Sequence, residues 1–406
     1  MGTMTNAAQT VTSQQEHDQN AQPNNRIVLT SDESPNGALY WSRTSGNDLD
    51  RMLQEASYPQ EVRENFMTWY RDVICPLLGD KPQSDSQKCG IGWDGNPLEY
   101  SFELRGSMQK QNVRFVVDLT QLRPVNTKNL LSIKNAQSVI DTLAQQTPGF
   151  DDTWYRALKS YMMYDHRPIE QQQALVDHAG QQTQLILGFD IARHVPPTGG
   201  LPVMGKVYFP PCFAAEARGL TRWQASRQAI QQLPGIESFP NVLKSADMIN
   251  DYLSDKPQAW QMGVRWLATD LVSPAKARFK VYMRCFGTDF DAIWDYYTLG
   301  GRIPDLEEDK QKFRDLLDLT SGSSYADTRN DKQMKMARFT SVTKKLTAIY
   351  FSLSPTNPYP APKLCIYPSN FAPNDQVIAQ GFDAWLKKYN WANGTKSMEE
   401  QVKNVL

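Results

Sequence analysis

Hydrophobic positions along the chain switch between a helical and a strand-like spacing. Over 49–56 and again over 60–78, apolar residues recur every three or four positions, which predicts two amphipathic helices. The spacing then changes to every second residue over 99–104 and 113–119, which predicts a pair of strands. Helical spacing returns across 130–164. The chain therefore starts with a helix pair, a strand pair and a second helical region.

This order of elements repeats along the chain. Further strands are predicted at 183–191, 205–209, 263–271, 278–284, 346–352 and 363–367, and further helices at 221–233, 242–253, 289–299, 305–319 and 374–389. Consecutive strands imply antiparallel hairpins, and the order does not fit the strand–helix alternation of a doubly wound parallel sheet. We therefore expect an α+β fold in which helices cover one face of an antiparallel sheet.

A single folded domain is expected over 36–392. Residues 1–35 are rich in Gln, Asn, Ser and Thr and contain few large apolar groups, which predicts a disordered polar tail. Residues 393–406 are polar and do not alternate, so we expect a polar C-terminal tail there. No run approaches the roughly 18 apolar residues of a membrane span, and the N-terminus lacks the pattern of a secretory leader.

Charge and cysteine usage limit the partners that the sequence favours. The formal net charge of -1 gives no reason to expect a nucleic acid or an anionic membrane as partner. Five scattered cysteines, none in a C-x-x-C pair, suggest a reducing cytosol and no disulfide framework. With four histidines and no Cys/His cluster, a zinc site is not expected. We therefore expect a cytoplasmic protein without a metal site; a homodimer stays open.

The most informative strand has the sequence Arg-Phe-Lys-Val-Tyr-Met-Arg at 278–284. Alternate side chains of a strand share a face, so one face carries Arg278, Lys280 and Tyr282, while the other is apolar and suits a helical layer. The cationic face has two interpretations. It is either the solvated side of an open sheet, which is common for one strand alone, or the wall of an interior that binds a polyanion.

Other predicted strands have the same design, which favours the interior site. Lys206 and Tyr208 share a face, Lys363 and Tyr367 share a face, and Arg114 lies between two apolar residues. Clustered cations on rigid strands suit a diphosphate, because charged hydrogen bonds strengthen in a low-dielectric site. Ionisation of a prenyl diphosphate also produces an allylic cation, which electron-rich rings such as that of tyrosine can shield from water.

A carboxylate is predicted at the start of the first strand. The run Asp-Gly-Asn-Pro at 94–97 is a strong turn signal that delivers Glu99 to this position. There it could accept a proton from, or orient, an indole N–H or a phenol O–H as the ring attacks, which is general-base work. The alternative is a surface glutamate beside a turn.

With these residues laid out, the chain resembles the fungal dimethylallyl tryptophan synthase family of aromatic prenyltransferases. The resemblance spans roughly Trp41 to Trp385. It rests on the order and spacing of Gly-Asn-Pro-Leu-Glu-Tyr-Ser at 95–101, Val-Arg-Phe at 113–115, Gly-Phe-Asp at 188–190, Lys-Val-Tyr-Phe-Pro at 206–210, Arg-x-Lys-x-Tyr at 278–282, Thr-Leu-Gly-Gly-Arg at 298–302, Pro-Lys at 362–363 and Asn-Asp at 374–375.

The resemblance implies a closed barrel of ten antiparallel strands built from repeated αββα units and ringed by helices. It also implies transfer of a dimethylallyl group from dimethylallyl diphosphate by a Friedel–Crafts-like attack that needs no metal or other cofactor. By position, Glu99 matches the glutamate of the family that engages the aromatic acceptor. The other matching residues are cations that bind the diphosphate and tyrosines that shield the allylic cation. The cations are Arg114, Lys206, Arg278 and Lys280, to which the strand pattern adds Lys363; the shield consists of Tyr208 and Tyr282.

Two departures from the family pattern change the expected site. The family usually has an aromatic residue where Cys365 stands, and Tyr367, two residues on and on the same face, is our candidate replacement in the shield. Only eight strands are predicted instead of ten, so we expect the barrel to lack its last strand pair. A missing hairpin would leave two unpaired edges and open the interior to water.

The sequence leaves the acceptor open between two chemical classes. The form Asp-Gly-x-Pro-x-Glu-Tyr-Ser at 94–101 favours a phenolic polyketide, and an indole such as tryptophan is the alternative. A different class of function is a non-catalytic barrel that lost closure and binds an apolar ligand. A third interpretation treats the basic faces as nucleic-acid contacts, which the near-neutral charge argues against.

Overall fold

The computed structural model describes residues 37–81, 91, 96–103, 111–120, 129–180, 182–286, 289–325, 334–336, 339–342, 347–366, 371–391 and 396–405. The description below concerns the unit Asn36–Leu406. The polar tail predicted at 1–35 lies outside the described residues.

Eight strands form one antiparallel sheet in the order β1-β2-β3-β4-β5-β6-β9-β10. They are β1 (Leu98–Glu103), β2 (Asn112–Val117), β3 (Ile186–Ile191), β4 (Val203–Phe209), β5 (Val264–Asp270), β6 (Phe279–Cys285), β9 (Thr347–Ser354) and β10 (Asn357–Ile366). Each of the eight predicted strands is present, which confirms the predicted fold class. A separate two-stranded sheet, which the polarity pattern did not predict, consists of β7 (Met334–Met336) and β8 (Phe339–Val342).

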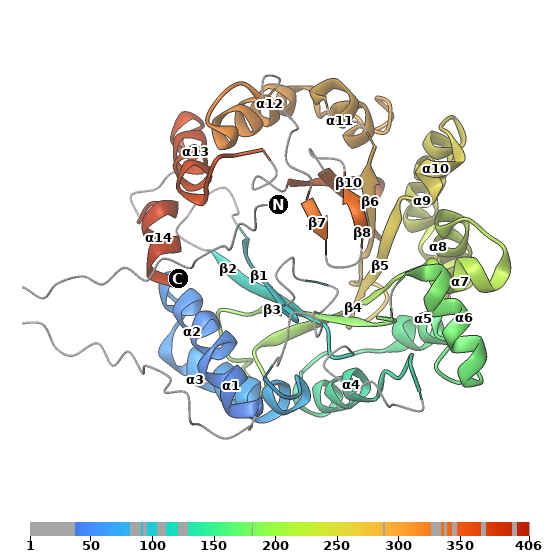
Figure 1. The fold of residues 1–406 in the computed structure, drawn as a ribbon, viewed down its shortest axis with the longest axis horizontal. Helices are drawn as coiled ribbons and strands as arrows, with labels where there is room; N and C mark the ends of the chain where they lie inside the picture. Colours follow the sequence, from blue (N-terminus) through green and yellow to red (C-terminus); the bar gives the residue numbers. More distant parts are fainter. Residues whose placement is uncertain are drawn as a thin grey trace, which may run out of the picture. The chain divides into compact units, whose positions relative to one another are not determined.

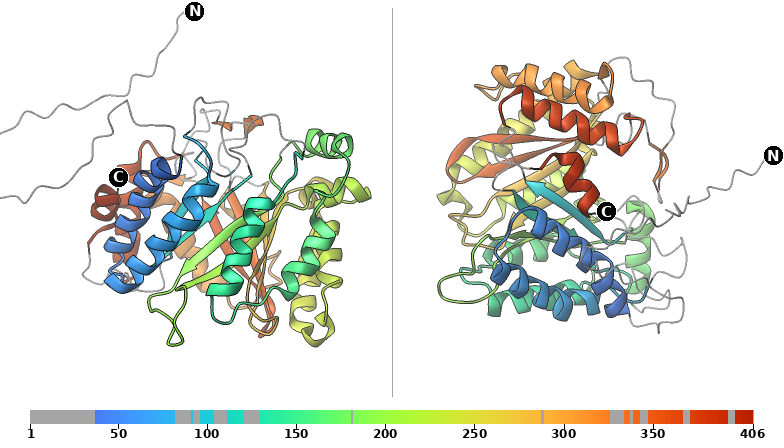
Figure 2. Two further views of the ribbon diagram at one scale, coloured as in Figure 1. Left: turned by 90° about the horizontal axis from the view of Figure 1, so that it is seen from below. Right: turned by 90° about the vertical axis from the view of Figure 1, so that its left-hand side faces the viewer.

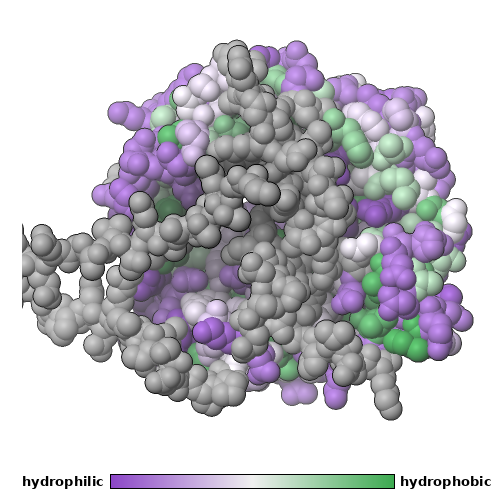
Figure 3. Space-filling model, in the orientation of Figure 1, coloured by the Kyte–Doolittle hydropathy of each residue, from purple (hydrophilic) through white to green (hydrophobic). Residues whose placement is uncertain are grey.

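Helices surround this sheet on its outer side (Figures 1 and 2). They are α1 (Gly37–Arg43), α2 (Ser45–Glu55), α3 (Gln60–Trp69), α4 (Lys134–Gln146), α5 (Thr153–Met162), α6 (Ile169–Ala179), α7 (Cys212–Arg218), α8 (Arg222–Gln231), α9 (Pro240–Ser254), α10 (Gln258–Gln261), α11 (Phe290–Tyr297), α12 (Glu307–Ser321), α13 (Asp375–Lys388) and α14 (Met398–Val405). After α3 the helix continues as a π-helical turn over Tyr70–Ile74. On the face seen in Figure 3, the residues at the periphery are mostly hydrophilic, with hydrophobic patches on the right-hand side.

Aromatic side chains join the helices to the outer face of the sheet. Residues of the strands alternate, so that Val113, Phe115 and Val117 of β2 are buried under α3 while Arg114 faces the opposite side. Aromatic pairs recur around the sheet, and such pairs add to the stability gained from buried area. They are Phe66–Phe115 (5.9 Å between ring centroids), Trp69–Phe189 (5.3 Å), Tyr155–Phe209 (6.1 Å), Trp154–Phe279 (4.8 Å) and Tyr296–Phe351 (6.3 Å).

The segment predicted as a polar C-terminal tail includes helix α14, which lies beside α2 and α13 (Figure 1). Its buried residue is a glutamine: Gln401 is 2% exposed and accepts a hydrogen bond of 3.0 Å from Gln111 Nε2. The N-terminus of α14 is held by Asp383, whose carboxylate accepts from Met398 N at 2.7 Å. The largely polar sequence of this segment did not predict the helix, although Val405 packs against the hydrophobic core.

The sheet curls until its two edge strands face each other. In a flat sheet the first and last of eight strands would lie roughly 34 Å apart, since neighbouring strands are about 4.8 Å apart. Glu103 of β1 and Lys363 of β10 nevertheless form an ion pair, with 3.5 Å between Oε1 and Nζ. Among the described residues, β1 and β10 pair with β2 and β9 respectively and not with each other. The curled sheet thus has an inner face bordered by two unpaired edges.

Candidate active site

The inner face of the sheet collects the cationic residues that the sequence singled out. Arg114, Lys206 and Lys280 project inward from β2, β4 and β6, and Arg278 directly precedes β6. Lys363 lies on the edge strand β10, in register with Tyr350 of β9. Lys206 and Lys280 are only 4% and 6% exposed, so they are not solvated side chains of an open sheet. The interpretation as an interior cationic site therefore agrees with their positions.

Each of these five cations contacts an acidic side chain. Arg114 bridges Glu103 (2.6 Å) and Asp190 (2.9 Å), and Asp190 also pairs with Lys206. Asp270, at the end of β5, binds Arg278 Nε at 2.8 Å and Lys280 Nζ at 3.2 Å. The sequence pattern did not single out Glu103, Asp190 and Asp270, although all three lie on the inward-facing positions of predicted strands.

Burial makes the charge of the lysines sensitive to their surroundings. Burial and, to a smaller extent, the nearby Lys280 lower the pKa of Lys206 to about 7, while Asp190 opposes the shift. Burial likewise lowers the pKa of Lys280, against the effect of Asp270. The pKa of Asp270 lies below its usual value because Lys280 and Arg278 outweigh the effect of burial. The carboxylates and lysines therefore form one coupled set of charges.

Tyrosines line the inner face next to the cations. The ring centroids of Tyr208 and Tyr282 are 5.8 Å apart, and those of Tyr282 and Tyr350 are 4.7 Å apart. Burial raises the pKa of all three phenols, so they stay protonated at neutral pH. Tyr350 was missed by the sequence reasoning, although it alternates with the apolar Ile349 and Phe351 in a predicted strand. Tyr367, predicted for the shield, lies outside the described residues.

A glycine makes room for the first of these tyrosines. Gly188 of β3 faces inward opposite Lys206, and the ring of Tyr208 packs directly over it. A methyl group added at Gly188 would lie 2.7 Å from Tyr208 Cε2 and 3.1 Å from Val116 Cγ1. These distances are too short for carbon atoms in contact. The absence of a side chain at Gly188 therefore fixes where the Tyr208 ring can lie.

Glu99 also lies on the inner face, at the β1 edge. Its side chain is accessible to solvent, yet burial by surrounding protein raises the pKa of its carboxyl group. The register of β1 places Glu99 on the same face as Glu103, which contacts Arg114. Cys365 of β10 is near enough for the charge of Glu99 to raise its thiol pKa, after burial, to about 12. The thiol is therefore protonated at neutral pH.

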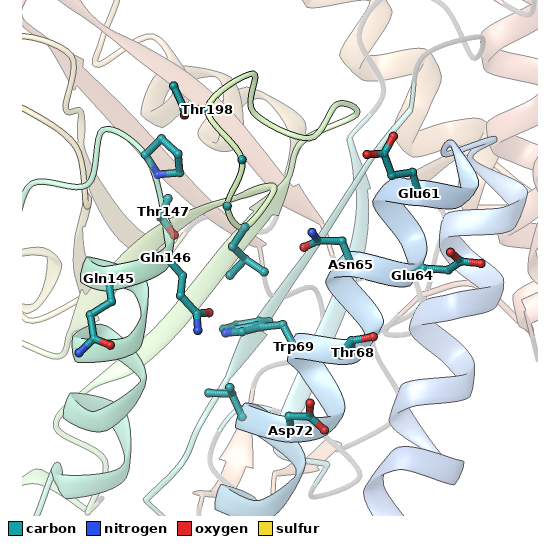
Figure 4. A pocket seen from close by; sticks show the side chains of 15 residues that line it. Glu61, Glu64, Asn65, Thr68, Trp69, Asp72, Gln145, Gln146, Thr147 and Thr198 are labelled. Carbon is teal, nitrogen blue, oxygen red and sulfur yellow. The ribbon is translucent and has the colours of Figure 1, made fainter.

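A separate groove lies on the outer side of the protein, between α3, α4 and the loop at 198–201 (Figure 4). Its volume is about 940 Å³. The charged residues that line it are Glu61, Glu64 and Asp72, and no lysine or arginine is among its lining residues. A diphosphate would be repelled there, so the groove does not compete with the inner face as an anion site.

Among the described residues, no group of three or more His, Cys, Asp and Glu side chains is arranged to hold a metal ion. In the same part of the chain, no helix combines the length and the apolar character needed to cross a bilayer.

Known proteins resemble this chain over nearly its whole length. The family model for tryptophan dimethylallyltransferase matches residues 38–401. The chain is 64% identical over 375 residues to prenyltransferase phnF from Penicillium herquei, covering 92% of this chain and 84% of that protein. It is 53% identical over 371 residues to the DMATS-type prenyltransferase mfmD from Annulohypoxylon moriforme, covering 91% and 84%.

Solved structures show the same fold. The crystal structure of NotF in complex with brevianamide F and DMSPP matches with a TM-score of 0.72 at 17% sequence identity, covering 93% of this chain and 88% of that one. At this identity the likeness concerns the fold, which is the antiparallel sheet ringed by helices that the sequence predicted.

We expect the substitution Gly188→Ala to displace the Tyr208 ring and to destabilise the protein by about 1–3 kcal/mol, as overpacking in a filled site does. Chemical unfolding monitored by circular dichroism measures this change. The matched control is Gly46→Ala in α2, where the added methyl group meets no atom closer than 3.6 Å. Equal stability of both variants would show that Tyr208 does not depend on the space at Gly188.

Proposed function

Because this chain belongs to the tryptophan dimethylallyltransferase family and is an aromatic prenyltransferase, we propose that the inner face of its sheet is where a dimethylallyl group passes from diphosphate to an aromatic acceptor. The observation that carries this proposal is the meeting of five cations, which lie on β2, β4, β6 and β10 or directly before β6, beside a row of three tyrosines. The cations suit the released diphosphate, and the tyrosines suit the allylic cation.

The donor would bind with its diphosphate against Arg114, Lys206, Arg278, Lys280 and Lys363. Ionisation breaks the bond between the allylic carbon and the bridging oxygen, and both electrons leave with the diphosphate. Fixed cations stabilise the negative charge that develops on this leaving group, and their effect is large where water is excluded. Lys206 and Lys280, which are nearly inaccessible to solvent, are best placed for this role.

The tyrosine row would protect the dimethylallyl cation before the acceptor attacks it. Aromatic faces attract cations through their ring electrons. Tyr208, Tyr282 and Tyr350 form a continuous aromatic surface on neighbouring inward positions, and their protonated hydroxyl groups carry no charge that would combine with the cation. Tyr367 remains a candidate for the same shield.

Glu99 would act as the general base toward the acceptor. As a ring carbon forms its bond to the allylic carbon, removal of the proton from an attached O–H or N–H supplies electron density to the ring. The raised pKa of the Glu99 carboxyl group makes it a better proton acceptor than an ordinary glutamate. A phenol gives up its proton more readily than an indole N–H, so this pairing favours a phenolic acceptor.

Metal ions are not required in this proposal, because protein cations already occupy the position where a metal would otherwise neutralise the diphosphate. The test of the proposed function is incubation with dimethylallyl diphosphate and a panel of phenols and indoles, with and without a chelator. We expect prenylation of a phenol that persists with chelator. Loss of activity with the chelator would contradict metal independence, and ligand binding without any product would favour a non-catalytic binder.

We expect Lys280→Ala to weaken binding of the donor at least about tenfold, because it removes a buried charge from the diphosphate site. The dissociation constant of dimethylallyl diphosphate, measured by calorimetry, checks this. Lys403→Ala is the matched control, since Lys403 also pairs with a carboxylate, at 2.8 Å from Glu399, but on the outer helix α14. Unchanged donor affinity in the Lys280 variant would remove Lys280 from the site.

The substitution Glu99→Gln should lower kcat by about 100-fold or more while donor affinity stays within about threefold, because it removes only the proton acceptor. Steady-state kinetics together with donor binding separate these effects. Glu61→Gln, a change of the same kind in the outer groove, should leave both quantities unaltered. Full turnover by the Glu99 variant would show that another group takes the proton.

A further inference from the structure

The acidic residues of the inner face are unexpected in a site for an anion, because they compete with a diphosphate for the same cations. Asp270 has a side chain only 1% exposed and binds both Arg278 and Lys280. Asp190, 18% exposed, binds both Arg114 and Lys206. Each carboxylate therefore joins two of the proposed donor-binding cations, and neither lies on the protein surface.

Their positions follow from the pairing of the strands. Asp270 lies directly opposite Lys206 across the β4–β5 pair, and Asp190 lies directly opposite Arg114 across β2–β3. Arg278 and Lys280 approach Asp270 from the neighbouring strand β6. The two carboxylates thus alternate with the cations around the curl, and each cation is held at a fixed position by a partner on an adjacent strand.

Buried lysines need such partners to remain charged. Removing a charged group from water disfavours its charged form, and a nearby like charge does so further. A carboxylate at hydrogen-bonding distance has the opposite effect. Without the carboxylates, Lys206 and Lys280 would face each other and two arginines in a low-dielectric interior, and they would release their protons at lower pH.

We propose that Asp190 and Asp270 are positioning residues that act as internal counter-anions, holding the donor-binding cations protonated and in place before diphosphate arrives. This rests on the proposed donor site. The proposal goes beyond that site by assigning to two acidic residues a role in the binding of an anion. Removal of a carboxylate should weaken anion binding at high pH. If the carboxylates only competed with the anion, their removal would strengthen binding at every pH.

The charged and titratable groups that face these carboxylates come from several strands. They are Glu103 of β1, Arg114 of β2, Lys206 and Tyr208 of β4, Arg278 and Lys280 at β6, and Tyr350 of β9. Of these, Lys206 has a pKa of about 7 and so changes charge near neutral pH, and burial lowers the pKa of Lys280 as well, whereas arginine stays protonated and the buried phenols stay neutral. A pH dependence of anion binding therefore reports mainly on Lys206 and Lys280.

The experiment measures binding of inorganic pyrophosphate by calorimetry at about pH 6 and about pH 8.5, for the wild type and for Asp270→Asn. Pyrophosphate itself loses protons over this range with either protein. At each pH we therefore compare the ratio of the dissociation constant of the variant to that of the wild type. We expect the variant to bind within about threefold of the wild type at the lower pH and at least about tenfold more weakly at the higher pH.

Proton uptake provides a readout that a purely structural effect would not change. Calorimetry in two buffers of different ionisation enthalpy gives the number of protons taken up on binding. At the higher pH we expect Asp270→Asn to take up more protons than the wild type, because Lys280 loses the carboxylate that favours its charged form. Asp295→Asn is the control: Asp295 also binds a lysine, Lys256, at 3.0 Å and accepts from Tyr252, but on the outer helices.

Three outcomes would overturn the inference: equal weakening at both pH values, tighter binding at both, or unchanged proton uptake. If wild-type protein does not bind pyrophosphate at all, the proposed donor site fails instead, so the two failures are distinguishable. Should Asp270→Asn not fold, Asp190→Asn gives the corresponding test through Lys206, because its side chain is less buried. Since the pKa of Lys206 is about 7 in the wild type, the weaker binding and the extra proton uptake are expected for this variant near neutral pH.

Discussion

The inner face of this protein depends on the pairing of buried charges. Lys206 and Lys280 have almost no contact with solvent, and a buried charge without a partner costs several kcal/mol. Asp190 and Asp270 are the partners of these two charges, and they reach the lysines only in the observed strand register. A slip of one residue would turn the charged side chains toward the helices and the aromatic ones inward. The ion pairs therefore fix the sheet and the site together.

The outer face complements this arrangement with apolar packing. Phe115, Phe189 and Phe351 are each about 1% exposed or less, and each meets an aromatic side chain of a covering helix: α3 for the first two and α11 for Phe351. The helices thus hold the strands rigidly from outside, so the inward positions can carry polar groups that contribute little to the core. Rigid strands position catalytic groups more accurately than loops do, which suits chemistry that must guide a short-lived cation.

Much of this could be predicted from sequence because the two-residue period of a strand fixes which side chains share a face. Arg114, Lys206, Lys280, Tyr208 and Tyr282 were found in this way, and the eight strands that carry them were placed correctly. The acidic partners were not, since Asp270 meets Lys206 only through the β4–β5 register, which no local pattern reveals. Helix α14 was not predicted because its sequence is largely polar and its buried residue is a glutamine.

The junction between β1 and β10 has a mechanical consequence. Seven ladders of backbone hydrogen bonds hold the other neighbouring strands together, whereas this junction is spanned by Glu103 and a Lys363 side chain that is 53% exposed. An exposed pair of this kind contributes only about 0–1 kcal/mol. Among the described residues, the two ends of the sheet are therefore held together by side chains and by the helices around them, and not by the backbone.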